Sequence, residues 1–260
     1  MGFASATVAA AVAPSLAKSS RQGPSDPPVH AGFPSQDPAL VREVVLTSHF
    51  NIDRVRELVT ASPALAKGSW DWGFGDWESP IGAGSHMGRH DIVQLLIEHG
   101  ARPNVFTFAM MGSIESVKAA VAAQPGVQRI PGPHGITLLQ HAKNGGDRAK
   151  EVADYLESLG DADLRAKSLA ITDEEKAMYV GKYGFGPGEE DALIVGLNSG
   201  GSLSIRRRES FGRVLNRVEE HAFAPGGAPD VRIRFVVEDG KAVSVSVHDP
   251  HPLVTAQRVD

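Results

Sequence analysis

The sequence contains no cysteine among its 260 residues. This excludes disulfide bonds, zinc bound by thiolates and thiol catalysis, and it is compatible with either redox compartment. A strong excess of one charge is also missing, because 26 lysines and arginines are nearly balanced by 31 acidic residues. The net charge of −5 provides no global basic field, so we expect no nucleic-acid partner.

No apolar run is long enough to span a bilayer, which predicts that the chain has no integral membrane segment. The stretch that comes closest is residues 1–17, which is uncharged and rich in alanine. It ends in Ser15-Leu16-Ala17, which resembles the cleavage site of an export signal, but the basic opening is missing. We predict a truncated export signal and a periplasmic or secreted protein. A disordered tail on a cytoplasmic protein is the alternative.

Recognisable enzyme motifs are missing as well. There is no Gly-x-Ser-x-Gly elbow, and no Gly-x-Gly-x-x-Gly opens a helix after a strand. The glycines of 184–188 form a loop before a strand rather than a phosphate cradle. No nucleophile and base are recognisable as a pair. The sequence therefore predicts a protein that is not an enzyme, with no catalytic residues and no cofactor.

Residues 18–37 are rich in proline, serine and glycine, which predicts a linker. Helices are expected from Asp37 onward, with Asp37 as N-cap and Pro38 in the first helical position. Apolar residues then recur at helical spacing through residue 163.

The stretch Ser79–Asn104 is the most informative one. Ser79 is suited to capping a short helix, Gly88 to a tight turn, and Gly100 to ending a second, amphipathic helix. Residues 137–160 repeat this register, because Gly146 follows Thr137 by nine residues as Gly88 follows Ser79. The pattern resembles the ankyrin repeat, although Gly82 replaces the family's usual histidine. The resemblance implies three to four repeats over residues 38–163.

After residue 169 the apolar period changes from 3.6 to 2. Alternating segments such as Val243–His248 predict strands, and Asp239-Gly240 predicts a hairpin. We therefore expect an α+β protein of two domains: a short α-helical ankyrin-type solenoid, a connector at 164–178, and an all-β antiparallel sheet or barrel of six to eight strands at 179–260.

The β region also shows a resemblance, carried by Tyr179-Val180-Gly181-Lys182-Tyr183 and by Arg232–Phe235 before Asp239-Gly240. It is similar to a small lipocalin-like module at the C-terminus of some serine β-lactamase-related and other exported bacterial proteins. That module has no assigned chemistry, so the resemblance implies a fold and no reaction.

The spacing of the histidines does not predict a metal site. His86 and His90 are four residues apart, but a zinc site needs a third ligand, for which only Asp91 and His99 are near in sequence. Ankyrin repeats place polar residues at such exposed turns. We therefore predict a solvated face and no metal ligand.

All three tryptophans lie within eight residues, before the best-formed repeat. In an ankyrin array this loop joins two repeats, and exposed aromatics there are suited to anchoring a partner. The alternative is that they form the loop's own small core. The predicted partner-binding residues are Trp70, Trp72, Phe74, Trp77, His86 and Arg89.

These observations predict a monomeric bacterial scaffold whose ankyrin surface binds a protein partner. The β module would cap the array or add a second binding surface. Two alternatives remain open: small-molecule or lipid binding in the β module, and a role as accessory or inhibitor of a separately encoded hydrolase.

Overall fold

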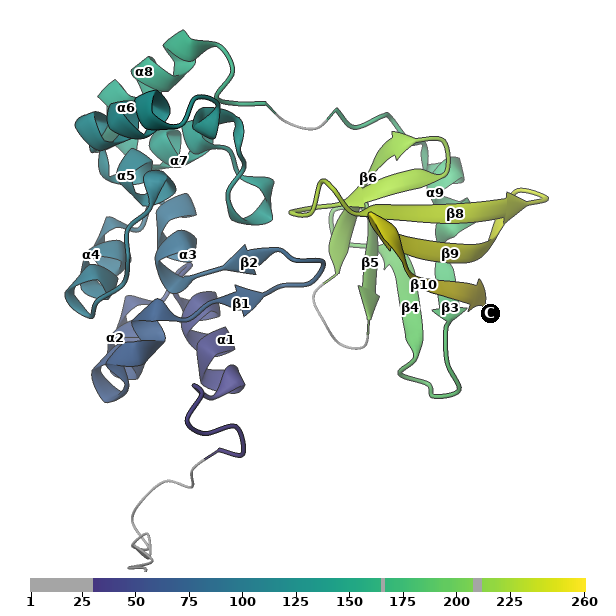
Figure 1. The fold of residues 1–260 in the computed structure, drawn as a ribbon. Helices are drawn as coiled ribbons and strands as arrows, with labels where there is room; N and C mark the ends of the chain where they lie inside the picture. Colours follow the sequence, from purple (N-terminus) through teal and green to yellow (C-terminus); the bar gives the residue numbers. More distant parts are fainter. Residues whose placement is uncertain (1–29, 165–166, 208–211) are drawn as a thin grey trace, which may run out of the picture. The chain divides into compact units, whose positions relative to one another are not determined.

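A computed structural model describes residues 30–164, 167–207 and 212–260 (Figure 1). The predicted export signal at 1–17, and the linker up to residue 29, lie outside the described residues. Residues 30–35 form hydrogen-bonded turns, and Gln36–Asp260 forms one compact unit. Within the described ranges, no helix combines the length and the apolar character that crossing a bilayer requires.

Eight α-helices occupy the first half of this unit and are arranged as consecutive pairs. The first helix of each pair contacts the first helix of the next pair, so the pairs stack. The helices are α1 (Pro38–Thr47), α2 (Ile52–Ala61), α3 (Pro80–His86), α4 (His90–Glu98), α5 (Val105–Met111), α6 (Ile114–Ala123), α7 (Leu138–Asn144) and α8 (Lys150–Leu159). Short 3₁₀ turns separate several of them: η1 (Pro63–Lys67), η2 (Val127–Arg129), η3 (Pro133–Gly135) and η4 (Gly146–Ala149).

Three of the predicted helix starts are confirmed by their capping bonds. Asp37 accepts a hydrogen bond from the N–H of Ala39, and α1 begins at Pro38 as expected. The hydroxyl of Ser79 accepts from the N–H of Gly82 at the start of α3, and Thr137 caps α7 in the same way. Each cap satisfies a backbone donor that the helix leaves without a partner.

The turn between α3 and α4 requires glycine for two reasons. Gly88 has φ +66°, which other residues rarely adopt. A Cβ there would also collide with the carbonyl oxygen of Asn144, at the end of α7. The close approach of two distant helix ends thus depends on this glycine.

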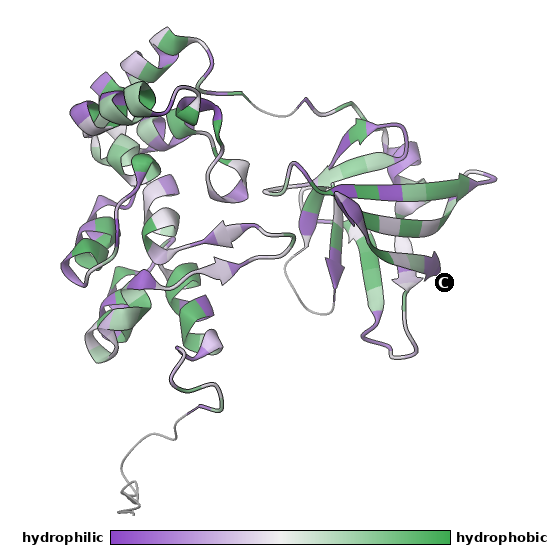
Figure 2. Ribbon diagram, in the orientation of Figure 1, coloured by the Kyte–Doolittle hydropathy of each residue, from purple (hydrophilic) through white to green (hydrophobic). Residues whose placement is uncertain are grey.

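Apolar side chains of the helices form two buried clusters. Figure 2 shows that apolar and polar residues alternate along these helices. Val44, Val55 and Ile92 are fully buried in the part built by α1 to α4. Leu138 and Leu156 are fully buried in the part built by the later helices. Burial of this kind is the main source of helix stability.

The tryptophan-rich segment was expected to be a loop, and it contains a short antiparallel hairpin instead. Strand β1 (Trp70–Asp71) pairs with β2 (Trp77–Glu78), so that Trp70 lies opposite Glu78. The hairpin places Glu78 directly before α3.

The second half of the unit is a closed antiparallel barrel of eight strands in the order β10-β3-β4-β5-β6-β7-β8-β9. Of the two expected forms, an open sheet or a barrel, the β region therefore adopts the barrel, and closure leaves the sheet no free edge. A short helix, α9 (Asp173–Tyr179), precedes the barrel, in the segment expected to be a connector. The strands are β3 (Gly181–Gly184), β4 (Ala192–Leu197), β5 (Leu203–Arg207), β6 (Arg213–Glu219), β7 (Ala222–Pro225), β8 (Arg232–Glu238), β9 (Lys241–Asp249) and β10 (His251–Arg258).

The barrel core is built from large side chains. Tyr179, Tyr183, Phe223 and Ile233 are fully buried, and aromatic rings contact one another edge to face. The predicted Asp239-Gly240 turn joins β8 to β9, with Glu238 paired to Lys241.

Candidate metal centre

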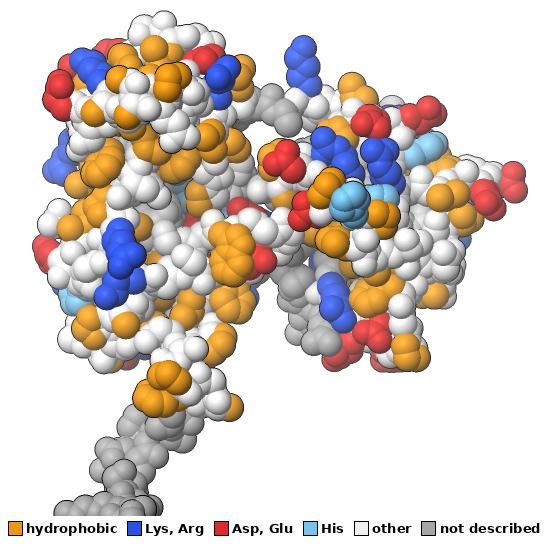
Figure 3. All heavy atoms as spheres, in the orientation of Figure 1, with side chains coloured by type: hydrophobic (Ala, Val, Ile, Leu, Met, Phe, Trp, Pro, Cys, Tyr) orange, Lys and Arg blue, Asp and Glu red, His pale blue; other side chains and the backbone are white. Residues whose placement is uncertain are grey.

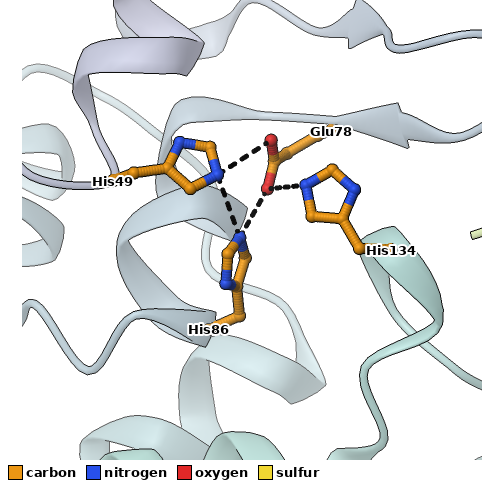
Figure 4. A group of neighbouring side chains, drawn as sticks. All are labelled: His49, Glu78, His86 and His134. Atoms are coloured by element: carbon orange, nitrogen blue, oxygen red, sulfur yellow. Dashed lines mark hydrogen bonds and ion pairs between the residues drawn. The ribbon is translucent and has the colours of Figure 1, made fainter. Parts of the chain in front are cut away.

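Four side chains from separate segments converge at one point in the helical region (Figure 4). His49 lies in the turn after α1, Glu78 ends β2, His86 ends α3 and His134 lies in η3. Each offers one ligand atom, and these atoms all lie within 4.8 Å of one another. Imidazole nitrogens and carboxylate oxygens are ligands that divalent transition metals use in proteins. The cluster is therefore a candidate metal centre.

Several of the distances between ligand atoms are close to those around a tetrahedral zinc ion. His86 Nε2 lies 3.2 Å from His49 Nε2 and 2.9 Å from Glu78 Oε1. Glu78 Oε1 lies 3.3 Å from His134 Nε2, and Glu78 Oε2 lies 3.5 Å from His49 Nε2. Ligands at zinc–nitrogen and zinc–oxygen bond lengths and tetrahedral angles are about 3.3 Å apart. These four spacings suit an ion at the centre of the cluster.

The backbone of α1 orients the ring of His49. Its Nδ1 lies 3.1 Å from the carbonyl oxygen of Val45 and 3.0 Å from that of Leu46. Carbonyl oxygens only accept hydrogen bonds, so Nδ1 carries the hydrogen and Nε2 of the neutral ring carries a lone pair. Burial is the largest influence on the pKa of His49 and lowers it, which favours the neutral ring. The inward-facing nitrogen thus has the form that a metal ligand needs.

Asp76 fixes the outer side of His134. The backbone N–H of His134 donates to Asp76 Oδ1, and its Nδ1 donates to Asp76 Oδ2, both at 2.8 Å. His134 has φ 61°, a left-handed conformation that is uncommon outside glycine and that clusters at functional sites. Metal-bound histidines typically donate their other ring N–H to a carboxylate or a carbonyl. His134 and His49 show these two arrangements.

Asp76 is ionised although it is only 3% exposed. Burial acts most strongly and raises the pKa of Asp76, but hydrogen bonds from the side chain and backbone of His134 outweigh it and lower the pKa. Arg213 of β6 also forms an ion pair with Asp76. An ionised carboxylate at this position increases the basicity of the His134 ring.

Glu78 supplies the negative charge of the centre and is 1% exposed. Its Oε2 accepts a hydrogen bond of 2.7 Å from Trp72 Nε1, which fixes the carboxylate plane. Burial raises the pKa of Glu78, yet hydrogen bonds from His134 and His86 outweigh it and lower the pKa to about 2. The carboxylate is therefore ionised throughout the physiological pH range.

A proton can take the place of the metal between His134 and Glu78. Burial lowers the pKa of His134, but the hydrogen bonds and charges of Asp76 and Glu78 raise it to about 9. Because Nδ1 already carries a hydrogen toward Asp76, the additional proton resides on Nε2, facing Glu78. A cation is thus favoured at this point, and metal binding would release the proton.

The expectation of a solvated face at His86 is wrong. His86 is 6% exposed and lies in the cluster, because α3 turns its last residue toward Glu78. Its sequence neighbours do not join it. His90 Nε2 contacts the carbonyl oxygen of Gly145, Asp91 pairs with Arg89, and His99 Nδ1 contacts the carbonyl oxygen of Leu95.

The predicted partner-binding residues separate into different environments. Trp70 and Trp72 are partly buried against the helical core, which agrees with the alternative that the loop packs on itself and its neighbours. Phe74 packs against the barrel core. Trp77 is 60% exposed, and Figure 3 shows apolar side chains at the surface of this hairpin. Arg89 pairs with Asp91 and donates to the carbonyl oxygen of Phe50 at 2.8 Å.

The sequence did not predict three members of the cluster: His49, Glu78 and His134. They lie in a turn, in a two-residue strand and in an irregular 3₁₀ turn, where no periodicity relates them to His86. Only one local signal was present. Glu78 directly follows Trp77, the last tryptophan of the tryptophan-rich segment.

Comparisons with known proteins add little. No family model matches the chain, and no curated protein matches it. A solved structure titled "Crystal structure of SurE" aligns with 46% of this chain at 17% identity and a TM-score of 0.27. The chain spans 28% of the length of that protein, and the likeness is too weak to support an argument.

Proposed function

We propose that the helical region binds a divalent transition metal ion, with zinc the best fit, through His49, Glu78, His86 and His134. One observation carries the proposal: outward hydrogen bonds direct Nε2 of His49, as a lone pair, and Nε2 of His134, which holds a proton when no metal is bound, toward an ionised carboxylate. Acceptors facing one another in this way need a cation between them. Zinc is favoured because nitrogen and oxygen ligands at tetrahedral spacing suit it.

The metal would link segments that are far apart in the chain. It would join the end of α1, the β1–β2 hairpin, the end of α3 and the η3 turn. A ligand that binds only the folded state stabilises that state, so the ion would hold the hairpin and the η3 turn against the helices.

Direct metal binding tests this proposal. The chelator-treated protein is titrated with zinc by calorimetry, and the bound metal is measured by elemental analysis. One equivalent is expected for the unaltered chain, and a large loss of affinity for His86→Ala and Glu78→Gln. His99→Asn is the matched control for His49→Asn, because both rings contact the carbonyl oxygen four residues earlier. Equal zinc binding in His49→Asn and His99→Asn would contradict the proposal.

We propose as a second function that the helical region is an ankyrin-type scaffold that binds a protein partner. The stacked helix pairs and the exposed indole of Trp77 support it. The barrel would then be the lipocalin-like module that caps the array. Capture of partners from a bacterial lysate with the unaltered chain and with Trp77→Ala tests this function. Trp70→Ala serves as a comparison, because that indole packs on the core. A partner lost only with Trp70→Ala would point to folding rather than to the surface.

A further inference from the structure

The candidate metal centre is closed on one side and accessible on the other. The side chains of Glu78 and His86 are 0% and 6% exposed. Those of His49 and His134 are 18% and 25% exposed. Solvent therefore reaches the cluster past His49 and His134.

A pocket of about 360 Å³ lies on this accessible side. This volume is within the range of small-molecule sites in proteins. The residues that line it are Leu46, His49, Phe50, Trp72, His134 and Arg213. Two of the four candidate metal ligands are thus also walls of a pocket, which a purely structural zinc site does not require.

We propose that the bound metal keeps one exchangeable coordination position facing this pocket, and that the position takes the carboxylate of a small aromatic acid. The inference rests on the metal binding proposed above and assigns a ligand class to the same site. Zinc can expand from four ligands to five, and the pocket that His49 and His134 border is the side from which a fifth ligand would enter.

The walls of the pocket suit both the aromatic ring and the carboxylate of such a ligand. Leu46, Phe50 and Trp72 offer apolar surface to a ring. A carboxylate oxygen suits both the metal and the cationic side chain of Arg213. Arg213 Nε is buried and has no hydrogen-bond partner among the described residues, although another of its nitrogens pairs with Asp76. A buried donor without a partner is costly, so an acceptor that reaches Arg213 would be favoured.

Cobalt(II) provides the test, because its visible absorption reports the number and geometry of its ligands. The chelator-treated protein is loaded with Co²⁺ and titrated with benzoate, acetate and benzyl alcohol. Benzoate is expected to change the spectrum saturably and to bind about tenfold more tightly than acetate, because its ring contacts the apolar walls. Benzyl alcohol, which has the ring without the charge, is expected to leave the spectrum unchanged.

A pair of variants separates the pocket from the metal. Phe50→Ala removes a pocket wall that offers no metal ligand, and it is expected to weaken benzoate binding about threefold or more while the spectrum of the cobalt protein stays the same. Phe33→Ala is the control, because Phe33 is 69% exposed, Phe50 is 60% exposed, and Phe33 does not line the pocket. This variant is expected to change neither the affinity for benzoate nor the spectrum of the cobalt protein.

The outcomes distinguish this inference from the proposal on which it rests. If Co²⁺ binds and benzoate leaves the spectrum unchanged, the coordination sphere is closed and the inference is wrong, although metal binding stands. Equal affinity for benzoate and acetate would overturn the assignment to an aromatic acid. If neither Co²⁺ nor Zn²⁺ binds, both proposals fail.

Discussion

Trp72 Nε1 donates a hydrogen bond of 2.7 Å to Glu78 Oε2, which ties the indole of the hairpin to the buried carboxylate of the candidate metal centre. Oε1 of the same carboxylate lies 2.9 Å from His86 Nε2. Oε2 thus accepts the hydrogen bond that orients Glu78, while Oε1 faces His86 and His134. This relationship gives a tryptophan first considered as a partner anchor a role inside the molecule.

Replacing Trp72 by phenylalanine is expected to weaken zinc binding by about 10- to 100-fold, the usual effect of losing a residue that orients a metal ligand. The apolar packing is largely kept, so the fold should persist. Competition with a chromophoric chelator measures the affinity. Trp77→Phe alters an indole that is 60% exposed and is expected to change nothing. Equal losses in the two variants would refute the role assigned to Trp72.

Zinc is expected to raise the thermal stability of the protein, and chelation should reverse the effect. At a free zinc concentration of about one hundred times Kd, the stabilisation is about 2.7 kcal/mol. For a compact unit of this size, that corresponds to a rise in Tm of roughly 5–10 °C. Differential scanning calorimetry with and without zinc measures it. The rise should disappear in His86→Ala and persist in His99→Asn, and a rise of the same size in both variants would locate the metal elsewhere.

Two glycines with similar backbone conformations are expected to respond differently to alanine. Gly88 has φ +66° and its added Cβ would strike the carbonyl oxygen of Asn144, whereas Gly100 has φ +87° and nothing within 4 Å of that position. Gly100→Ala should cost about 1 kcal/mol of unfolding free energy from backbone strain alone. Gly88→Ala should cost more, because the contact between α3 and α7 must also open. Urea unfolding of both variants gives the comparison, and equal losses would mean that the steric contact is unimportant.

His141 is expected to make the metal-free protein less stable in acid. Burial is the main cause that lowers the pKa of His141 to about 4, against 6.5 for the free side chain. The folded state binds the proton of His141 less tightly than the unfolded state does. The free energy of unfolding therefore has its full value, as far as His141 is concerned, above pH 6.5, and it decreases as the pH falls toward 4. The full difference is on the order of 3 kcal/mol.

Urea unfolding of the unaltered chain and of His141→Gln, in the presence of a chelator, measures this contribution. The carboxylates that titrate in the same range are common to both proteins and cancel in the difference. The stability gap between the two should therefore shift in favour of the variant as the pH falls from 7 to 4.5. A gap that stays constant with pH would show that His141 does not titrate as its burial implies.

Much of the secondary structure could be predicted from the sequence, because the interactions that set it are local. Asp37 and Ser79 cap the helices that begin directly after them, and the expected strand at Val243–His248 lies within β9. Asp239-Gly240 makes the expected hairpin turn. The two-residue strands β1 and β2 were missed, because pairing so short depends on the fold around it.

The sequence by itself determined where three of the helices begin, that an antiparallel β region follows the helical one, and that no cysteine is available as a metal ligand. Only the tertiary structure decided that the β region closes into a barrel and that His49, Glu78, His86 and His134 meet. Their rings and carboxylate are brought together by the stacking of helices and by the η3 turn, which Asp76 holds. Such convergence depends on contacts between segments that are far apart in the sequence. The spacing of residues in the sequence predicts only contacts between residues that are close to one another in the chain.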